Sequence, residues 1–150
     1  MKYKFAALIS LMLISGASFA QDTAKCVTAN NHQIEKLFDK WNDSLKTGDP
    51  KIVTDNYLSD AVLLPTLSNK VRLSEAERLD YFQHFLEKHP IGKIDSRTIK
   101  IHCDSAIDTG TYTFTFADKT SVSARYTFTY FWNGIEWKIS THHSSAMPEK

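Results

Sequence analysis

Two different spacings of apolar residues divide the chain into a helical first half and a strand-rich second half. Residues 32–46 carry apolar side chains at the i, i+3, i+4 and i+7 positions of one helix face, and Gly48 is positioned to end that helix. Asp49 followed by Pro50 predicts a second, short helix, because Asp is a favoured N-cap and Pro a favoured first helical residue. A short apolar strand over residues 61–64 follows.

A third helix begins with a capping box, the motif Ser74-Glu75-Ala76-Glu77. The hydroxyl and the second carboxylate of this motif each accept a hydrogen bond from a backbone amide that has no partner within the helix. We expect the helix to run to about Lys88, where His89 and Pro90 stop it. Three helices therefore precede the main strand region.

After Gly92 the pattern changes to the alternation of polar and apolar residues that is typical of strands. It predicts strands over about 94–106, 111–116, 121–132 and 135–145. Between the last two strands, Asn133-Gly134 predicts a two-residue type I′ hairpin. Helices followed by an antiparallel meander indicate a single domain of the α+β class.

The two-residue turn would fix how the last two strands pair, with Trp132 opposite Ile135 and Ala124 opposite His143. Even-numbered residues of one strand and odd-numbered residues of the other then share the face that packs on the helices. This face is aromatic near the turn and becomes small and polar away from it, as in a pocket lining. The residues expected at this polar end are Tyr126, Thr141, Ala124, His143 and Ser145. The alternative interpretation is a strand end that frays into solvent.

Two arginines are candidates for the recognition of a ligand or a partner. In the predicted register Arg125 lies opposite His142 on the outer face of the sheet, toward a partner subunit or water, unless a β-bulge turns the pair inward. Arg97 shares a strand face with Ile99 and Ile101, so it can point inward, where it needs a counter-charge or an anionic ligand. The alternative for Arg97 is an extended side chain whose charged end reaches solvent at the sheet edge.

The first 20 residues have the features of a secretory signal peptide. Lys2 and Lys4 precede an apolar run over residues 5–14, and small residues stand at the −3 and −1 positions of a cleavage site near Ala20. The run is too short for a membrane span. We therefore expect an exported protein, periplasmic or secreted, whose single domain spans residues 21–150 and which keeps no membrane anchor after cleavage.

Charge and cysteine content limit the classes of partner. Without the two leader lysines the formal charge falls from +1 to about −1, which gives no electrostatic reason to expect nucleic acid. In an exported chain, Cys26 and Cys103 predict one disulfide, and the alternative is a pair of buried free thiols. Two cysteines and scattered histidines lack the spacing of a zinc site, and no phosphate-binding loop is present, so we expect no metal and no cofactor.

Several sequence segments resemble those of known protein families. The order of elements and the segments Phe38–Asn42, Gly48–Pro50 and Tyr57–Pro65 are similar to the first half of the nuclear transport factor 2-like cone fold. The ending Trp137–Pro148 resembles the tail of the association (hub) domain of calcium/calmodulin-dependent protein kinase II, and more closely its stand-alone bacterial relatives. The resemblance covers almost all of the expected mature domain.

The resemblance implies a cone of three N-terminal helices packed on a strongly bent antiparallel sheet, with a deep pocket. It implies homodimers, or higher oligomers, formed through the outer sheet face, and it places the inward histidine at His143. Distant relatives include ketosteroid isomerases, scytalone dehydratase, limonene epoxide hydrolase and SnoaL-like cyclases. This chain contains no kinase domain, so no kinase activity is expected of it.

The sequence thus favours a domain that binds a small ligand and homo-oligomerises. The expected ligand-binding residues are Tyr57, Tyr126, Thr141, His143, Arg97 and Arg125. The alternative is a small SnoaL-like isomerase, cyclase or hydrolase, in which His143 is the general base and Tyr126 or Tyr57 donates a hydrogen bond to an oxyanion. No inward carboxylate is identifiable from the alternation, although enzymes of this fold generally use one.

Overall fold

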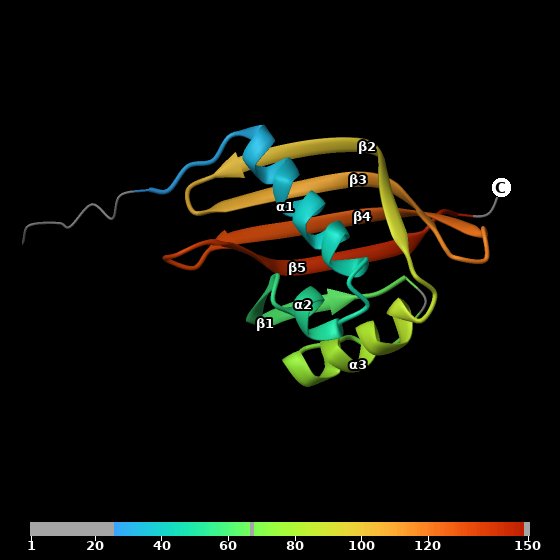
Figure 1. Ribbon diagram of the computed structural model, residues 1–150. Helices are drawn as coiled ribbons and strands as arrows, with labels where there is room; N and C mark the ends of the chain where they lie inside the picture. Colours follow the sequence, from blue (N-terminus) through green and yellow to red (C-terminus); the bar gives the residue numbers. More distant parts are fainter. Residues whose placement is uncertain (1–25, 67, 149–150) are drawn as a thin grey trace, which may run out of the picture.

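The computed structural model describes residues 26–66 and 68–148, and within them it contains three helices and one five-stranded sheet (Figure 1). The elements are α1 (Asn31–Leu45), α2 (Pro50–Thr54), β1 (Tyr57–Leu64), α3 (Glu75–Leu86), β2 (Ile91–His102), β3 (Ser105–Thr115), β4 (Ser121–Trp132) and β5 (Trp137–Ala146). The predicted α+β class is confirmed. The expected signal peptide lies outside the described residues.

The second and third helices begin where the capping residues predicted. Asp49 caps α2 with Pro50 as the first helical residue, and Ser74 caps α3 in a reciprocal capping box with Glu77. The first helix starts one residue earlier than expected, because Asn30 forms a capping box with Gln33. None of the described helices has the length and apolar content needed to cross a membrane.

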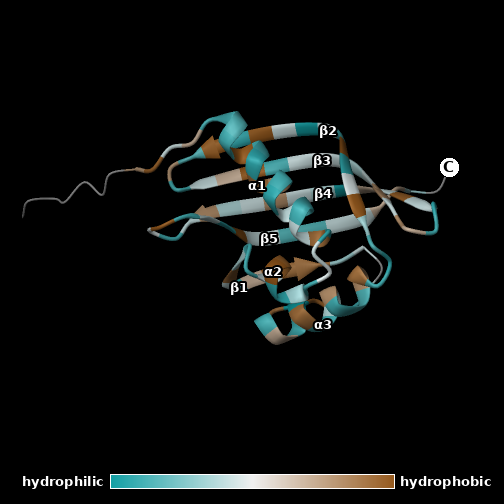
Figure 2. Cartoon of the chain, viewed as in Figure 1, coloured by the Kyte–Doolittle hydropathy of each residue, from teal (hydrophilic) through white to brown (hydrophobic). Residues whose placement is uncertain are grey.

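The sheet has the strand order β1-β5-β4-β3-β2, so the predicted antiparallel meander runs from β2 to β5. The first strand adds a feature that the sequence did not predict, since it joins the edge of β5 in parallel. Figure 1 shows α1 lying across one face of the sheet, with α2 and α3 gathered beside β1. Much of α1 is hydrophilic in Figure 2, as expected for a helix that buries one stripe only.

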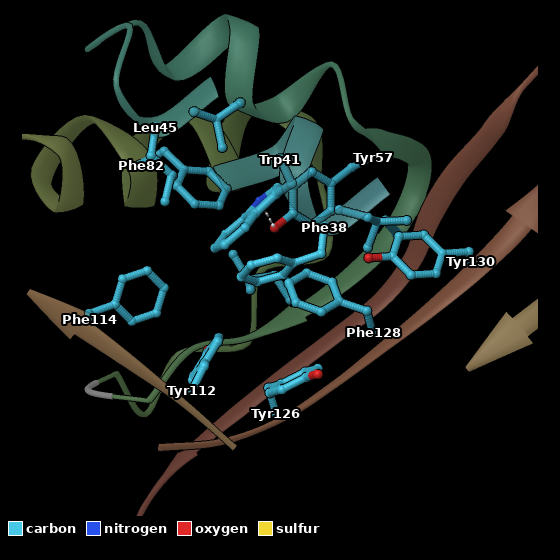
Figure 3. Packing of buried hydrophobic residues seen from close by; sticks show 14 of the residues in the cluster. Phe38, Trp41, Leu45, Tyr57, Phe82, Tyr112, Phe114, Tyr126, Phe128 and Tyr130 are labelled. Atoms are coloured by element: carbon cyan, nitrogen blue, oxygen red, sulfur yellow. Dashed lines mark hydrogen bonds between the residues drawn. The ribbon is translucent and has the colours of Figure 1, made fainter. Parts of the chain in front are cut away.

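The core between the helices and the sheet is largely aromatic. Phe38 and Trp41 of α1 pack against Phe128 of β4, with ring centroids 6.0 and 5.2 Å from it (Figure 3). All three side chains are at most 3% exposed. This packing holds α1 against β4, in the interior of the sheet.

The loop between β4 and β5 differs from the predicted two-residue turn. Trp132 pairs with Trp137, so the loop has four residues, 133–136. The Asn133 side chain accepts hydrogen bonds from the backbone amides of Ile135 and Glu136, both at 2.9 Å. Ile135 is consequently 83% exposed and not part of the core face, which corrects its predicted position.

A β-bulge at Ser140 then exchanges the two faces of β5. Tyr130 pairs with Ile139 but Thr129 pairs with Thr141, which leaves Ser140 as an extra residue. The backbone amide of Ile139 donates to the carbonyl of Asn56 at 2.8 Å and ties this point of β5 to the start of β1. One extra residue moves every later side chain to the opposite face. The prediction that His143 and Ser145 face the helices was therefore wrong.

At the end of the sheet that carries the β4–β5 loop, β3 is longer than predicted. It begins at Ser105 and not near 111, because Cys103 and Asp104 make a tight turn in which Asp104 has a φ of 54°. The predicted disulfide between Cys26 and Cys103 is present, with Cα atoms 5.2 Å apart. Two hydrogen bonds between Val27 and Asp104 strengthen the same link between the N-terminal segment and the sheet.

Candidate functional site

A cavity of about 380 Å³ lies between α3 and the concave face of the sheet. Much of its wall is aromatic, formed by Tyr81, Phe82, Phe85, Tyr112, Phe114 and Phe116 together with Trp41. Figure 3 shows Phe82, Phe114 and Tyr112 around the open space beside Trp41. A concave, mostly apolar site with a few convergent polar groups is the usual form of a small-ligand pocket.

Three hydroxyl groups meet at one end of this cavity. Tyr112 donates a hydrogen bond of 2.6 Å to Ser144 Oγ, and the Thr66 hydroxyl forms a short hydrogen bond with the same oxygen. Ser144 is only 7% exposed and lines the cavity together with Thr66 and Tyr112. Three hydroxyls carry three hydrogens, and two are used within the cluster, so one O–H remains to donate to a ligand.

His142 lies two residues before Ser144 on the same face of β5 and also lines the cavity. Its imidazole is stacked on Phe128, with ring centroids 3.9 Å apart, and meets the edge of Trp41 at 5.2 Å. The Tyr57 hydroxyl lies 2.9 Å from His142 Nδ1. His142 Nε2 is buried and has no hydrogen-bond partner among the described residues.

Burial sets the charge of these groups. Desolvation, together with the neighbouring His143, lowers the pKa of His142 to about 3. The imidazole is therefore neutral at neutral pH and can donate one hydrogen bond. Burial also raises the pKa of Tyr57 and of Tyr112 well above the usual value, which keeps both hydroxyls protonated.

The rim of the cavity is basic. Arg72, His84 and Lys88 line it, and no Asp or Glu does so among the described residues. Arg72 pairs with Asp80 outside the cavity, while the Lys88 ammonium lies 5.9 Å from the ring centroid of Phe116. The charge of the wall therefore favours a ligand that is anionic or has an electron-rich end.

A buried arginine shapes the segment that leads to the site. Arg78 of α3 is 1% exposed and donates to the backbone carbonyls of Ala61, Leu58 and Ser59 at 2.5, 2.9 and 2.9 Å. These carbonyls belong to the part of β1 where the pairing with β5 is irregular. By satisfying them, Arg78 holds the stretch of chain between Tyr57 and the pocket residue Thr66.

Two of the predicted site residues belong to a separate polar cluster. Arg97 Nε donates to Asp108 Oδ1 at 3.2 Å, and Tyr126 donates to the same oxygen at 2.8 Å. Asp108 is fully buried, and burial raises its pKa although Tyr126 and Arg97 act in the opposite direction. Arg97 thus points inward and has its counter-charge within the protein. None of the three residues lines the cavity.

Asp108 also corrects the expectation that no carboxylate points inward. It was missed because the residues before 111 were not assigned to β3. Once β3 starts at Ser105, Asp108 shares its face with Ala106 and Tyr112, and the alternation identifies it as buried.

The other predicted site residues lie outside the pocket. His143 is exposed, and Thr141 is half-buried opposite Thr129. Arg125 is exposed on the outer face and pairs with Ser145, not with His142. Tyr57 takes part indirectly, through its hydrogen bond to His142. Sequence reasoning missed the pocket residues Thr66, Tyr112, His142 and Ser144.

No group of three or more His, Cys, Asp or Glu residues that could hold a metal ion is found within residues 26–66 and 68–148. The pocket itself offers hydroxyls, a neutral imidazole and a basic rim.

The chain matches one protein family and several solved structures. The sequence model of the calcium/calmodulin dependent protein kinase II association domain matches residues 30–148. A crystal structure from Xanthomonas campestris, assigned to the same association domain, is 48% identical, with a TM-score of 0.79 over 81% of this chain and 91% of that chain. No curated protein matches the chain significantly.

More distant structures share the fold. One is assigned as a dehydratase of the nuclear transport factor 2-like family from Streptomyces avermitilis, at 13% identity, a TM-score of 0.71, and coverage of 79% of this chain and 96% of that chain. Another is the iota-carbonic anhydrase from a cyanobacterium, complexed with bicarbonate, at 16% identity, a TM-score of 0.72, and coverage of 82% and 95%. At these identities the similarity shows a common fold and no more.

Proposed function

The chain belongs to the calcium/calmodulin dependent protein kinase II association domain family, and we propose that its pocket binds bicarbonate and interconverts it with carbon dioxide. The observation that carries this proposal is the convergence of His142 with the Thr66–Ser144–Tyr112 hydroxyl cluster at one end of the cavity. The bicarbonate complex of the cyanobacterial carbonic anhydrase supports it, since a protein of the same fold binds this ion.

The hydrogen-bonding groups match a small oxyanion. The hydroxyl cluster has one O–H left to donate, and the neutral imidazole of His142 has one N–H, so the pocket offers two donors at one end of the cavity. Two donors suit the two oxygens on one side of a carboxylate or bicarbonate. The basic rim formed by Arg72, His84 and Lys88 adds attraction for the anion.

The aromatic wall suits carbon dioxide, the second substrate of the interconversion. Carbon dioxide is apolar and enters an aromatic cavity without losing strong hydration, whereas bicarbonate needs the polar end. Water attacks the carbon of carbon dioxide, one new C–O bond forms, and one proton is released. The N–H of His142 and the free O–H of the hydroxyl cluster stabilise the negative charge that develops on the former carbon dioxide oxygens.

The released proton needs a route to solvent, which we assign to His84. His84 is exposed, lines the cavity, and donates from Nδ1 to the backbone carbonyl of Asp80 at 2.8 Å, so Nε2 is the nitrogen left to accept a proton. Histidine is the side chain best suited to exchange protons near neutral pH. His142 is unsuited to this role, because its low pKa makes it a weak base.

A second candidate function is favoured by the volume of the cavity. At about 380 Å³ it holds a ligand larger than bicarbonate, and its aromatic wall suits an apolar body attached to a carboxylate or carbonyl group. Such a ligand would be bound for an isomerase, cyclase or hydrolase reaction. In that reaction His142, in place of the expected His143, would act as a hydrogen-bond donor to the carbonyl or carboxylate oxygen and not as the base.

We further propose that the protein forms homodimers or higher oligomers through the outer face of the sheet, as the name of its association domain family suggests. The outer face of β4 presents Arg125, Thr127, Thr129 and Phe131, and Phe131 is 44% exposed. An isologous contact between two copies of this face would cover that ring.

We also propose export with cleavage near Ala20, which mass spectrometry of the mature N-terminus tests.

Binding and turnover are tested with two neighbouring serines that face opposite ways. Ser144→Ala removes the hydroxyl at the centre of the cluster, whereas Ser145→Ala removes one from the other face of β5. Exchange of ¹⁸O between bicarbonate and water, and the thermal shift with bicarbonate, are measured for both variants and the wild type. We expect both signals in the wild type and Ser145→Ala, and a loss of about tenfold or more in Ser144→Ala. Absence of exchange and of stabilisation in the folded wild type contradicts the proposal, while stabilisation only by larger carboxylates favours the second candidate.

A further inference from the structure

Behind the pocket wall, Trp41, Tyr57 and His142 form a buried chain of hydrogen bonds. The indole nitrogen of Trp41 lies 3.0 Å from the Tyr57 hydroxyl oxygen, which lies 2.9 Å from His142 Nδ1. The first of these contacts is drawn in Figure 3. The three side chains come from α1, β1 and β5 and are 1%, 5% and 4% exposed. Tyr57 does not itself line the cavity, whereas Trp41 and His142 do.

The direction of these hydrogen bonds follows from what each group can donate. An indole N–H only donates, so the Tyr57 oxygen accepts from Trp41. The Tyr57 hydroxyl hydrogen then has one acceptor within reach among the described residues, His142 Nδ1. A buried hydroxyl rarely goes without a partner. Tyr57 therefore donates to Nδ1, and the neutral imidazole carries its single hydrogen on Nε2.

The other imidazole nitrogen of His142, Nε2, has a different environment from Nδ1. Nε2 of His142 is buried without a hydrogen-bond partner among the described residues, and the side chain lines the cavity. We infer that Tyr57 is a positioning residue, which holds His142 in the Nε2–H tautomer so that the imidazole donates a hydrogen bond to an acceptor oxygen of the bound ligand. This inference rests on the proposed function for the identity of that ligand, bicarbonate.

The tautomer also defines which ligands this position accepts. An Nε2–H group attracts a carboxylate or bicarbonate oxygen and repels an ammonium or amide N–H. Rotation of the imidazole by half a turn would break the hydrogen bond to Tyr57 and leave the tyrosine hydrogen without an acceptor among the described residues. The selection for an acceptor oxygen is therefore built into the packing of the core.

The first test is the ¹⁵N spectrum of the imidazole in protein labelled at histidine. Resonances of His142 are assigned by their loss in His142→Gln. We expect an unprotonated, hydrogen-bonded Nδ1 and a protonated Nε2, with no change between pH 5 and 8. A spectrum with the hydrogen on Nδ1, or a ring that titrates in this range, overturns the inference. This measurement needs no ligand, so it is independent of whether the protein hydrates carbon dioxide.

The second test compares two buried tyrosines. Tyr57→Phe removes the donor to His142, whereas Tyr130→Phe removes a hydroxyl that is equally buried but has no hydrogen-bond partner among the described residues. We expect Tyr57→Phe to give a mixture of tautomers and about tenfold weaker binding of bicarbonate, and Tyr130→Phe to leave both unchanged. Identical ¹⁵N spectra and affinities in the two variants contradict the positioning role. If Tyr57→Phe does not fold, the wild-type spectrum alone decides.

Discussion

His142 lies flat against Phe128, with ring centroids 3.9 Å apart, because the β-bulge at Ser140 turns it toward the helices. The stacking, the edge of Trp41 and the hydroxyl of Tyr57 together fix the orientation of the imidazole. A group held in this way needs no reorganisation when a ligand arrives, which is how a small pocket gains affinity and catalytic power. The consequences can be measured in stability as well as in activity.

The stability of the protein should depend on pH through His142. The folded-state pKa is lowered by burial to about 3 from the usual 6.5, so between these values the unfolded state binds a proton that the folded state does not. The stabilisation is complete above pH 6.5 and is lost as the pH falls, by about 1.4 kcal/mol per pH unit. Urea unfolding of the wild type between pH 7.5 and 4.5 measures this slope.

The matched variants for that experiment are His142→Gln and His143→Gln. The first removes the buried group, so its unfolding free energy should fall less steeply with decreasing pH than that of the wild type. The second changes an exposed neighbour and should keep the wild-type slope. Equal slopes in all three proteins would show that His142 is not buried as a neutral group.

The disulfide should contribute strongly to stability. Cys26 and Cys103 are separated by 77 residues, and the chain-entropy model gives roughly 4 kcal/mol for closing such a loop. The Cys26→Ser/Cys103→Ser variant should therefore lose about this much unfolding free energy in urea, and added reductant should affect the wild type only. An unchanged unfolding midpoint in the double variant would contradict the prediction.

The outer sheet face offers a direct test of self-association. Phe131→Asp places a charge at an exposed ring on β4 and should reduce the mass measured by light scattering toward that of a monomer. Ile135→Asp changes an even more exposed apolar residue in the β4–β5 loop and serves as the control. A wild type that is monomeric at all concentrations rules out the proposed interface.

Much of the fold could be predicted because local rules fix it. The Ser74 capping box, the Asp49-Pro50 start and the alternation along β4 each depend on neighbouring residues, and each gave the observed element. The parallel pairing of β1 with β5 could not be predicted in this way. It depends on contacts between distant segments, such as the hydrogen bond from Ile139 to Asn56.

The site shows a different limit. The segment His142-His143-Ser144-Ser145 has a His and a Ser two residues apart on both faces of the strand, so the sequence predicts these types in the pocket whichever face turns inward. The sequence does not decide whether His142 and Ser144 or His143 and Ser145 face the pocket, because the single bulge residue Ser140 exchanges the two faces. For Arg97 the sequence left two positions open, and the structure shows the inward one. Its partner Asp108 was missed because the predicted strand began near 111 and not at Ser105.

The most direct test of the account is the rate of carbon dioxide hydration, measured by stopped flow for the wild type, His142→Gln and His143→Gln. We predict catalysis above the buffer rate in the wild type, a loss of at least about tenfold in His142→Gln, and no change in His143→Gln. A wild type without catalysis, or a loss confined to His143→Gln, would contradict the assignment of the pocket and of its histidine.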